Sequence, residues 1–317
     1  PLRAWDVNLD GLKYHSEPDP ALRPRAFARN ANVLLAKNGS WSFKCWCQGL
    51  NQTAANATAV TQENLGLLLE TAWGGQNLGT SRTIGAASTT TVINIATTAG
   101  LVAGAGVMIN GEARRILVVN ANVSIELDMA LTNAPATSDL CKAAATYYPD
   151  ESALVDLYDA AHYSLASLFR GYHAEDQWQG RGCMPQVELA NLGAGKSLQL
   201  DVTMHSAIWA LVSSVAASTA PTEAAPAVQK GGGLYIQNVA TTTKKILHTK
   251  NEAIKLGLAP TPLESPAGTE GIGGYITTGG DTSLEFEVLY DSEHNIAYEA
   301  GTAKYAGYQI GTGVLIT

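Results

Sequence analysis

Cysteine, charged side chains and aromatic rings are all scarce in this chain of 317 residues. Its four cysteines, Cys45, Cys47, Cys141 and Cys183, are too few for a disulfide scaffold in a chain of this length, so we expect free thiols. Only 15% of the residues are charged, and 20 basic against 28 acidic side chains give a net charge of -8. A protein that wraps nucleic acid neutralises phosphates with Lys and Arg, so this charge excludes a broad DNA-binding surface.

Long apolar runs are also missing. None reaches the roughly 20 residues that cross a bilayer, and no basic region followed by an apolar stretch opens the sequence. We therefore expect a soluble protein that is made in a cytoplasm and has no membrane partner. A hydrophobic fraction of 46% supports a folded core, and a surface rich in Thr, Ser, Ala and Gly is typical of proteins that contact other proteins.

Alternation of apolar and polar residues is the strongest local pattern, and it predicts a mainly β fold of antiparallel strands. It is clearest over residues 198–205 and 283–290. One helix is expected over residues 62–73, capped by Thr61 and stopped by Gly74 and Gly75. A second, shorter helix is expected to start after Pro149 and to end near residue 162.

Residues 80–146 differ in composition from the rest of the chain, because they are rich in Thr and Ala and contain no aromatic residue. We expect them to form an inserted small β-barrel or β-sandwich of four or five strands, and residues 1–79 and 147–317 to form a discontinuous host domain. Asn110-Gly111 predicts a hairpin with a type I′ turn. Over residues 122–130, the alternation places Ile125, Leu127 and Met129 inward and Ser124, Glu126 and Asp128 outward.

The motifs that could support catalysis or cofactor binding are each incomplete. Residues 193–197 end in Gly-Lys-Ser, as a phosphate-binding loop does, but Ala190 stands where the leading glycine belongs, and a strand follows instead of a helix. We interpret this segment as a hairpin turn. The six histidines are scattered, and Cys45 and Cys47 lack two further ligands for a structural metal. We therefore expect no catalytic residues, no cofactor and no metal, and hence no enzyme.

Acidic residues on the polar faces of the strands are the one candidate site. Glu188, Asp201, Glu285 and Glu287 are expected to point away from the core on one sheet. The simpler interpretation is a solvated face that keeps the protein soluble. The alternative is that subunits close into a ring with these carboxylates lining its bore, so that a polyanion slides past without binding.

The order of these parts resembles the major tail tube proteins of long-tailed, siphovirus-type bacteriophages, some of which carry an inserted small β domain. The early helix over residues 63–69 with Gly74 and Gly75 is similar to one in that family. Five further stretches are similar to its central and last strands: residues 164–171, 180–189 and 196–205 for the centre, and 274–276 and 306–313 for the end.

The resemblance implies a structural virion protein with no catalysis and no cofactor. Its subunits would be β-sandwiches that form hexameric rings and stack into a tube, with the inserted domain outside. Its partners would be copies of itself, the tape measure, baseplate and tail terminator proteins, and phage DNA passing non-specifically through the lumen during ejection. Its place would be the virion tail, after synthesis in the host bacterial cytoplasm.

Two alternatives stay open. Another virion component on a related fold, such as a baseplate ring, tail terminator or head-decoration protein, would share most of these features. An extracellular glycan-binding or adhesive β protein would need aromatic side chains grouped on one sheet face, whereas the six tryptophans are spread widely in the sequence.

Overall fold

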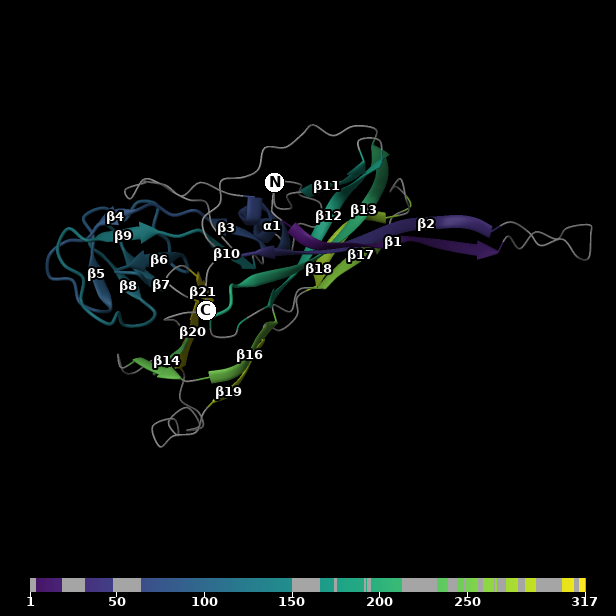
Figure 1. Ribbon diagram of the computed structural model, residues 1–317. Coiled ribbons are helices and arrows are strands. Elements are labelled where there is room, and N and C mark those ends of the chain that lie inside the picture. The colour runs from purple at the N-terminus through teal and green to yellow at the C-terminus, as the bar shows by residue number, and fades with distance from the viewer. Residues whose placement is uncertain are drawn as a thin grey trace, which may run out of the picture.

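The structure is a computed structural model of the chain (Figure 1). It describes residues 4–18, 32–47, 64–149, 166–173, 176–190, 192, 195–212, 233–238, 244–247, 249–255, 259–264, 266, 272–278, 283–288, 304–310 and 314–316. Antiparallel strands dominate, and α1 (Asn64–Trp73) is the only helix among these residues. The predicted mainly β fold is confirmed. The second predicted helix falls outside the described residues.

A seven-stranded antiparallel sheet forms the body of the molecule. Its order is β1-β2-β13-β12-β16-β19, and β11 pairs with β12 beside this path. The strands are β1 (Ala4–Pro18), β2 (Asn32–Trp46), β11 (Ala166–His173), β12 (Asp176–Ala190), β13 (Gln199–Val212), β16 (Thr249–Lys255) and β19 (Ser283–Val288). We call this the main sheet.

One face of the main sheet carries the core. Alternate residues of β2 and β13 are buried there, among them Trp41, Phe43 and Met204. The helix α1 covers this face with Leu65 and Leu68, which the 3.6-residue period of a helix places on one side. The core face therefore follows directly from the two periodicities in the sequence.

Two smaller sheets complete this part of the chain. One has the order β15-β14-β20-β21, and the other pairs β17 with β18. Their bounds are β14 (Gly233–Asn238), β15 (Lys244–Leu247), β17 (Ala259–Glu264), β18 (Ile272–Thr278), β20 (Lys304–Ile310) and β21 (Val314–Ile316).

Residues 82–143 form a six-stranded sheet of their own, with the order β4-β9-β6-β7-β8-β5. The backbone N–H of Gly85 donates to the carbonyl of Asn94 at 2.7 Å, so the chain just after β4 meets β5 and the sheet rolls up. We call this unit the barrel. Its strands are β4 (Arg82–Thr83), β5 (Val92–Asn94), β6 (Gly106–Ile109), β7 (Glu112–Asn120), β8 (Ser124–Leu127) and β9 (Leu140–Ala143).

The barrel has its own core, which is separate from that of the main sheet. It consists mostly of isoleucine, leucine and valine side chains, including Ile93, Ile116 and Ile125. The predicted hairpin between β6 and β7 is confirmed, because Asn110 and Gly111 have φ angles of 51° and 79°, as a type I′ turn requires. The barrel has six strands instead of the four or five expected.

Two of the outward positions predicted on β8 are wrong. Ser124 and Asp128 are only 4% and 2% exposed, whereas Glu126 is half-buried. The reason is local hydrogen bonding: the amide of Asn120 donates to the Ser124 hydroxyl at 3.1 Å, and the backbone N–H of Arg115 donates to the Asp128 carboxylate at 3.0 Å. Polar side chains are buried where such partners exist.

A two-stranded neck joins the barrel to the body. The strand β3 (Gly74–Asn77) follows α1 directly and pairs with β10 (Thr146–Pro149), so that the entering and leaving chains lie side by side. The backbone N–H of Gly106 in the barrel donates to the Thr146 hydroxyl at 2.7 Å. The division into an inserted domain and a host domain stays a prediction, which the separate sheet, separate core and paired neck support.

Candidate functional site

The four predicted acidic residues occupy register positions on one face of the main sheet, the face opposite the core. Glu188 on β12 lies directly opposite Asp201 on β13, and Asp201 lies opposite Lys44 on β2. Leu189 pairs with Ile254 and Ile254 pairs with Leu284, all at core-facing positions. Their neighbours Glu188 and Glu285 therefore share the other face, which we call the outward face.

The exposure of the four acidic side chains agrees with their placement on the outward face. Glu188, Glu285 and Glu287 are exposed, and Asp201 is half-buried. Like charges directly opposite on neighbouring strands repel each other, so the pairing of Glu188 with Asp201 is unfavourable by itself. The amide of Gln199 donates a hydrogen bond to Asp201 and offsets part of this repulsion.

Lysine residues also occupy positions on the outward face, and no sequence pattern indicated them. Lys44 forms an ion pair with Asp6 at 3.2 Å. Lys250 lies at the register position opposite Glu287, and Lys255 lies opposite Ser283, two residues before Glu285. The outward face therefore carries both signs of charge. Period-two alternation gave the faces of single strands, but only the register between strands brings these lysines beside the acids.

The hairpin of β17 and β18 covers one end of the outward face. The ring of His205 on β13 lies 5.7 Å from the ring of Tyr275 on β18, measured between centroids. Met184 pairs with His205 on this same face and is only 4% exposed. The outward face is thus partly the inner side of a second layer, and the acidic residues lie beyond the covered end.

Two tryptophans meet near the other end of the outward face. Trp5 on β1 and Trp46 on β2 have ring centroids 4.5 Å apart, and both are half-buried. They lie beside Lys44, which pairs with Trp5 across the strands.

A long hairpin arm extends from the main sheet (Figure 1). The strand β13 pairs with β2 only from Trp46 to Gly39. Beyond that point β1 and β2 continue paired with each other alone, from Leu12 opposite Gly39 to Pro18 opposite Asn32. We call residues 12–18 and 32–38 the arm. Since both of its edges lack a neighbouring strand in the described structure, the arm is a two-stranded ribbon that offers backbone groups on each side.

The structure also shows what the Gly-Lys-Ser segment and the cysteines form. The Gly-Lys-Ser segment joins β12 to β13, whose last pair is Ala190 with Gln199, so the predicted hairpin turn is confirmed. The four cysteines form no disulfide, and Cys45 and Cys47 both pack in the core of the main sheet. Burial raises the pKa of Cys141 to about 12, which makes this thiol unreactive near neutral pH. The described residues contain no group of three potential metal ligands.

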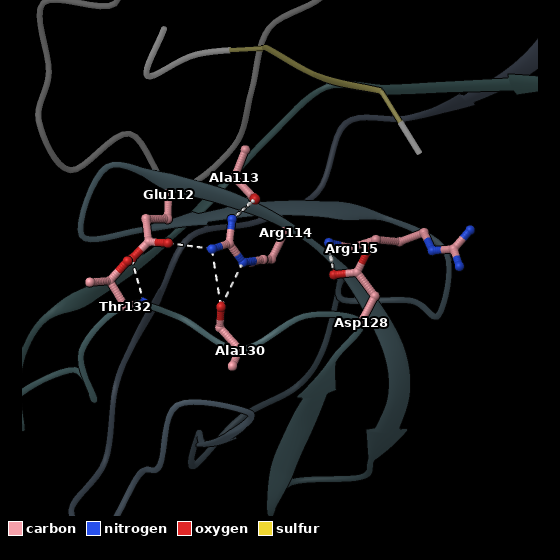
Figure 2. Close-up of polar contacts among 7 residues, drawn as sticks. All are labelled: Glu112, Ala113, Arg114, Arg115, Asp128, Ala130 and Thr132. Carbon is pink, nitrogen blue, oxygen red and sulfur yellow. Dashed lines mark hydrogen bonds and ion pairs between the residues drawn. The ribbon is translucent and has the colours of Figure 1, made fainter. Parts of the chain in front are cut away.

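The most elaborate polar cluster lies inside the barrel (Figure 2). Arg114 on β7 is fully buried and forms an ion pair with Glu112. Its guanidinium also donates to the carbonyls of Ala130, at 3.1 Å, and Ala113, at 2.7 Å. The second carboxylate oxygen of Glu112 accepts the backbone N–H of Thr132 at 2.7 Å. The contacts to Ala130 and Thr132 hold the segment after β8 against β7, so the cluster has a structural role.

No protein-family model matches the chain, and no curated protein matches it. At ten residues, α1 is too short to cross a bilayer, and the described residues include no longer apolar helix.

Proposed function

We propose that this chain is the structural subunit of the tail tube of a long-tailed bacteriophage. Copies of the main sheet and its smaller neighbours assemble into stacked rings, and the barrel lies on the outside of the tube. The subunit performs no catalysis and binds no cofactor. Its partners are its own copies, the tape measure, baseplate and tail terminator proteins, and the DNA that passes through the lumen.

The arm is the observation that carries this proposal. A two-stranded hairpin without further support is marginally stable in water, and exposed strand edges pair readily with strands of other chains. The arm extends over seven residue pairs from Leu12 to Pro18, with one irregularity in register. Pairing with a strand of a neighbouring protein would therefore stabilise it. We take this neighbour to be a second copy of the chain, because a contact between copies repeats in every subunit of a homo-oligomer.

The outward face is compatible with DNA passage. Exposed Glu188, Glu285 and Glu287 repel phosphates, and the three interspersed lysine positions are too few for the dense neutralisation that strong DNA binding needs. A wall with this mixed and slightly acidic charge neither holds nor strongly excludes a polyanion. In this proposal the part of the face beyond the β17–β18 hairpin lines the bore.

Electron micrographs and sedimentation of purified protein test the proposal, with a shortened arm as the variant. Deleting residues 13–38 and joining Leu12 to Gly39 through an Asn-Gly turn keeps every pair between β2 and β13. We expect tubes from the intact chain at high concentration and none from the short-arm variant. Isolated rings from the intact chain would favour another virion ring protein, and a persistent monomer would contradict the proposal.

A further inference from the structure

A β-bulge turns two successive residues of β1 toward the outward face. The register between β1 and β2 shifts between Trp5 and Asn8, where β1 carries one extra residue. Asp6 takes a φ of 50° at this bulge, a conformation that costs energy for residues other than glycine. Val7 then packs against the core, and Asp6 joins Trp5 on the outward face, where it pairs with Lys44. Bulges at sheet edges commonly re-aim side chains in this way, and β1 is an edge strand.

Aromatic rings and charged groups lie together at this bulge. Trp5 and Trp46 are in ring contact and half-buried, and the side chain of Asp6 is 63% exposed. We call this surface the tryptophan patch, and it consists of Trp5, Asp6, Lys44 and Trp46. Beside it on β13, Asp201 lies directly opposite Lys44. Tryptophan is enriched where proteins bind each other, so the patch is a candidate interaction surface.

The charges around the tryptophan patch favour a cationic partner. Three carboxylates, those of Asp6, Asp201 and Glu188, lie along this row of the sheet, and the amine of one lysine stands among them. The face of an indole ring attracts a cation, and a guanidinium also binds a carboxylate through two parallel hydrogen bonds. Arginine serves both contacts better than lysine, because its guanidinium is planar. The patch therefore suits an arginine-rich segment.

The connection between the two strands of the arm is such a segment. Residues 19–31 contain Arg23, Arg25 and Arg29 and a single acidic residue, although the whole chain has a net charge of -8. Three of the nine arginines of the chain thus fall within thirteen residues. We call residues 19–31 the arm tip, because they join the last residue pair of the ribbon. The arm tip and the tryptophan patch have opposite charges, as two complementary surfaces require.

The arm tip cannot reach the tryptophan patch of its own chain. Trp46 and Asn32 are the two ends of β2, a strand of 15 residues, which is roughly 46 Å long at about 3.3 Å per residue. The arm projects away from the body along this strand (Figure 1). A connection of this length that is anchored at both ends extends at most about 23 Å from its anchors. Contact between the two surfaces therefore requires two copies.

We propose that the arm tip of one copy binds the tryptophan patch of another. The inference rests on the proposed function, in which the arm contacts a neighbouring copy, and it names the surface that receives the arm. The two surfaces lie at opposite ends of the same strands, so each copy can give one contact and receive one. Such a heterologous contact adds copies head to tail, as the stacking of rings requires. Glu285 and Glu287 lie on β19, the other edge strand of the sheet path, and stay clear of it.

Sedimentation velocity of the full chain tests the contact with two variants that each remove one positive charge. Arg25→Gln, in the arm tip, should weaken association about threefold or more, because it removes one charge-assisted contact. Lys142→Gln is the matched control. Lys142 is exposed on β9 of the barrel, so this variant should associate like the wild type.

Variants of the two surfaces give a sharper test when they are mixed. The tip variant carries Arg23→Gln, Arg25→Gln and Arg29→Gln. The patch variant carries Trp5→Gln and Asp6→Asn, because asparagine tolerates the positive φ of this position. Each variant alone should associate at least about tenfold more weakly than the wild type. In the mixture, the intact tip of one variant meets the intact patch of the other, so pairs should form that neither variant forms alone at the same concentration.

The outcomes separate this inference from the proposed function. Recovery of pairs in the mixture supports the contact, even if micrographs of the wild type show open head-to-tail chains and no tubes. A tip variant that associates like the wild type, or a mixture without pairs, overturns the inference even if tubes form. A wild type that stays monomeric at every concentration contradicts both. If the patch variant has a lower unfolding midpoint than the wild type, Asp6→Asn alone replaces it in the mixture, with the same two outcomes.

Discussion

Replacing Arg114 with methionine should unfold the barrel far more easily than any surface change. Methionine keeps most of the aliphatic length but removes the guanidinium, which is fully buried. The Glu112 carboxylate and the carbonyls of Ala113 and Ala130 then lose their donor. Breaking a buried ion pair by removing one partner costs about 3–5 kcal/mol, so we expect Arg114→Met to lower the free energy of unfolding of the barrel by about that amount.

The neighbouring arginine provides the control. Arg115 is half-buried, and it is the backbone N–H of this residue that binds Asp128, so Arg115→Met keeps that hydrogen bond. We expect a loss below about 1 kcal/mol. Both variants replace an arginine of β7 with methionine, so the two differ mainly in how deeply the arginine is buried.

Hydrogen exchange of barrel peptides is the suitable assay. All six tryptophans lie outside the barrel, so their fluorescence reports on the rest of the molecule and should keep its unfolding midpoint in both variants. Equal exchange protection in the two variants would refute the structural role assigned to Arg114. A parallel loss of tryptophan signal would show that the barrel and the body do not unfold separately.

Three further predictions concern the barrel and the acidic residues. Deleting residues 80–146 and joining the paired ends of the neck with a short linker should leave assembly intact in micrographs, and loss of folding would show that the segment belongs to the core. Replacing Glu285 and Glu287 with lysine should spare assembly yet reduce infectivity, because DNA would bind the bore; unchanged infectivity would count against the lumen position. Burial raises the pKa of the Asp128 carboxyl above its usual value, although the hydrogen bond from the Arg115 N–H opposes this shift. The protonated carboxyl is therefore favoured in the folded state. The stability that Asp128 contributes is present at low pH and is lost as the pH rises through its folded-state pKa. Asp128→Asn should remove that part of the pH dependence of barrel unfolding, and identical pH profiles would contradict the effect of burial.

Sequence patterns predicted the parts of the fold that depend on local geometry. Alternation over residues 198–205 gave the faces of β13, because a pleated strand places successive side chains on opposite sides. Asn110-Gly111 gave the turn between β6 and β7, because both residues tolerate a positive φ. The early helix followed from its period and from the glycines that stop it.

Features that depend on partners across the sheet could not be predicted. Asp128 is buried because a backbone N–H thirteen residues earlier in the chain reaches it, and no pattern around residue 128 shows this. The pairing of Lys250 with Glu287 requires the register of β16 and β19, which alternation leaves open. Trp5 and Trp46 are far apart in the chain and meet only because β1 and β2 pair.

A cryo-electron microscopy reconstruction of the purified, concentrated protein would show directly how copies of the chain assemble. We expect a hollow assembly of repeated subunits, with the arm of each copy against a neighbour, Glu285 and Glu287 toward the bore, and the barrel on the outer surface. Dispersed single subunits at every concentration, or a closed assembly with the barrel inside and the outward face in contact with solvent, would contradict it.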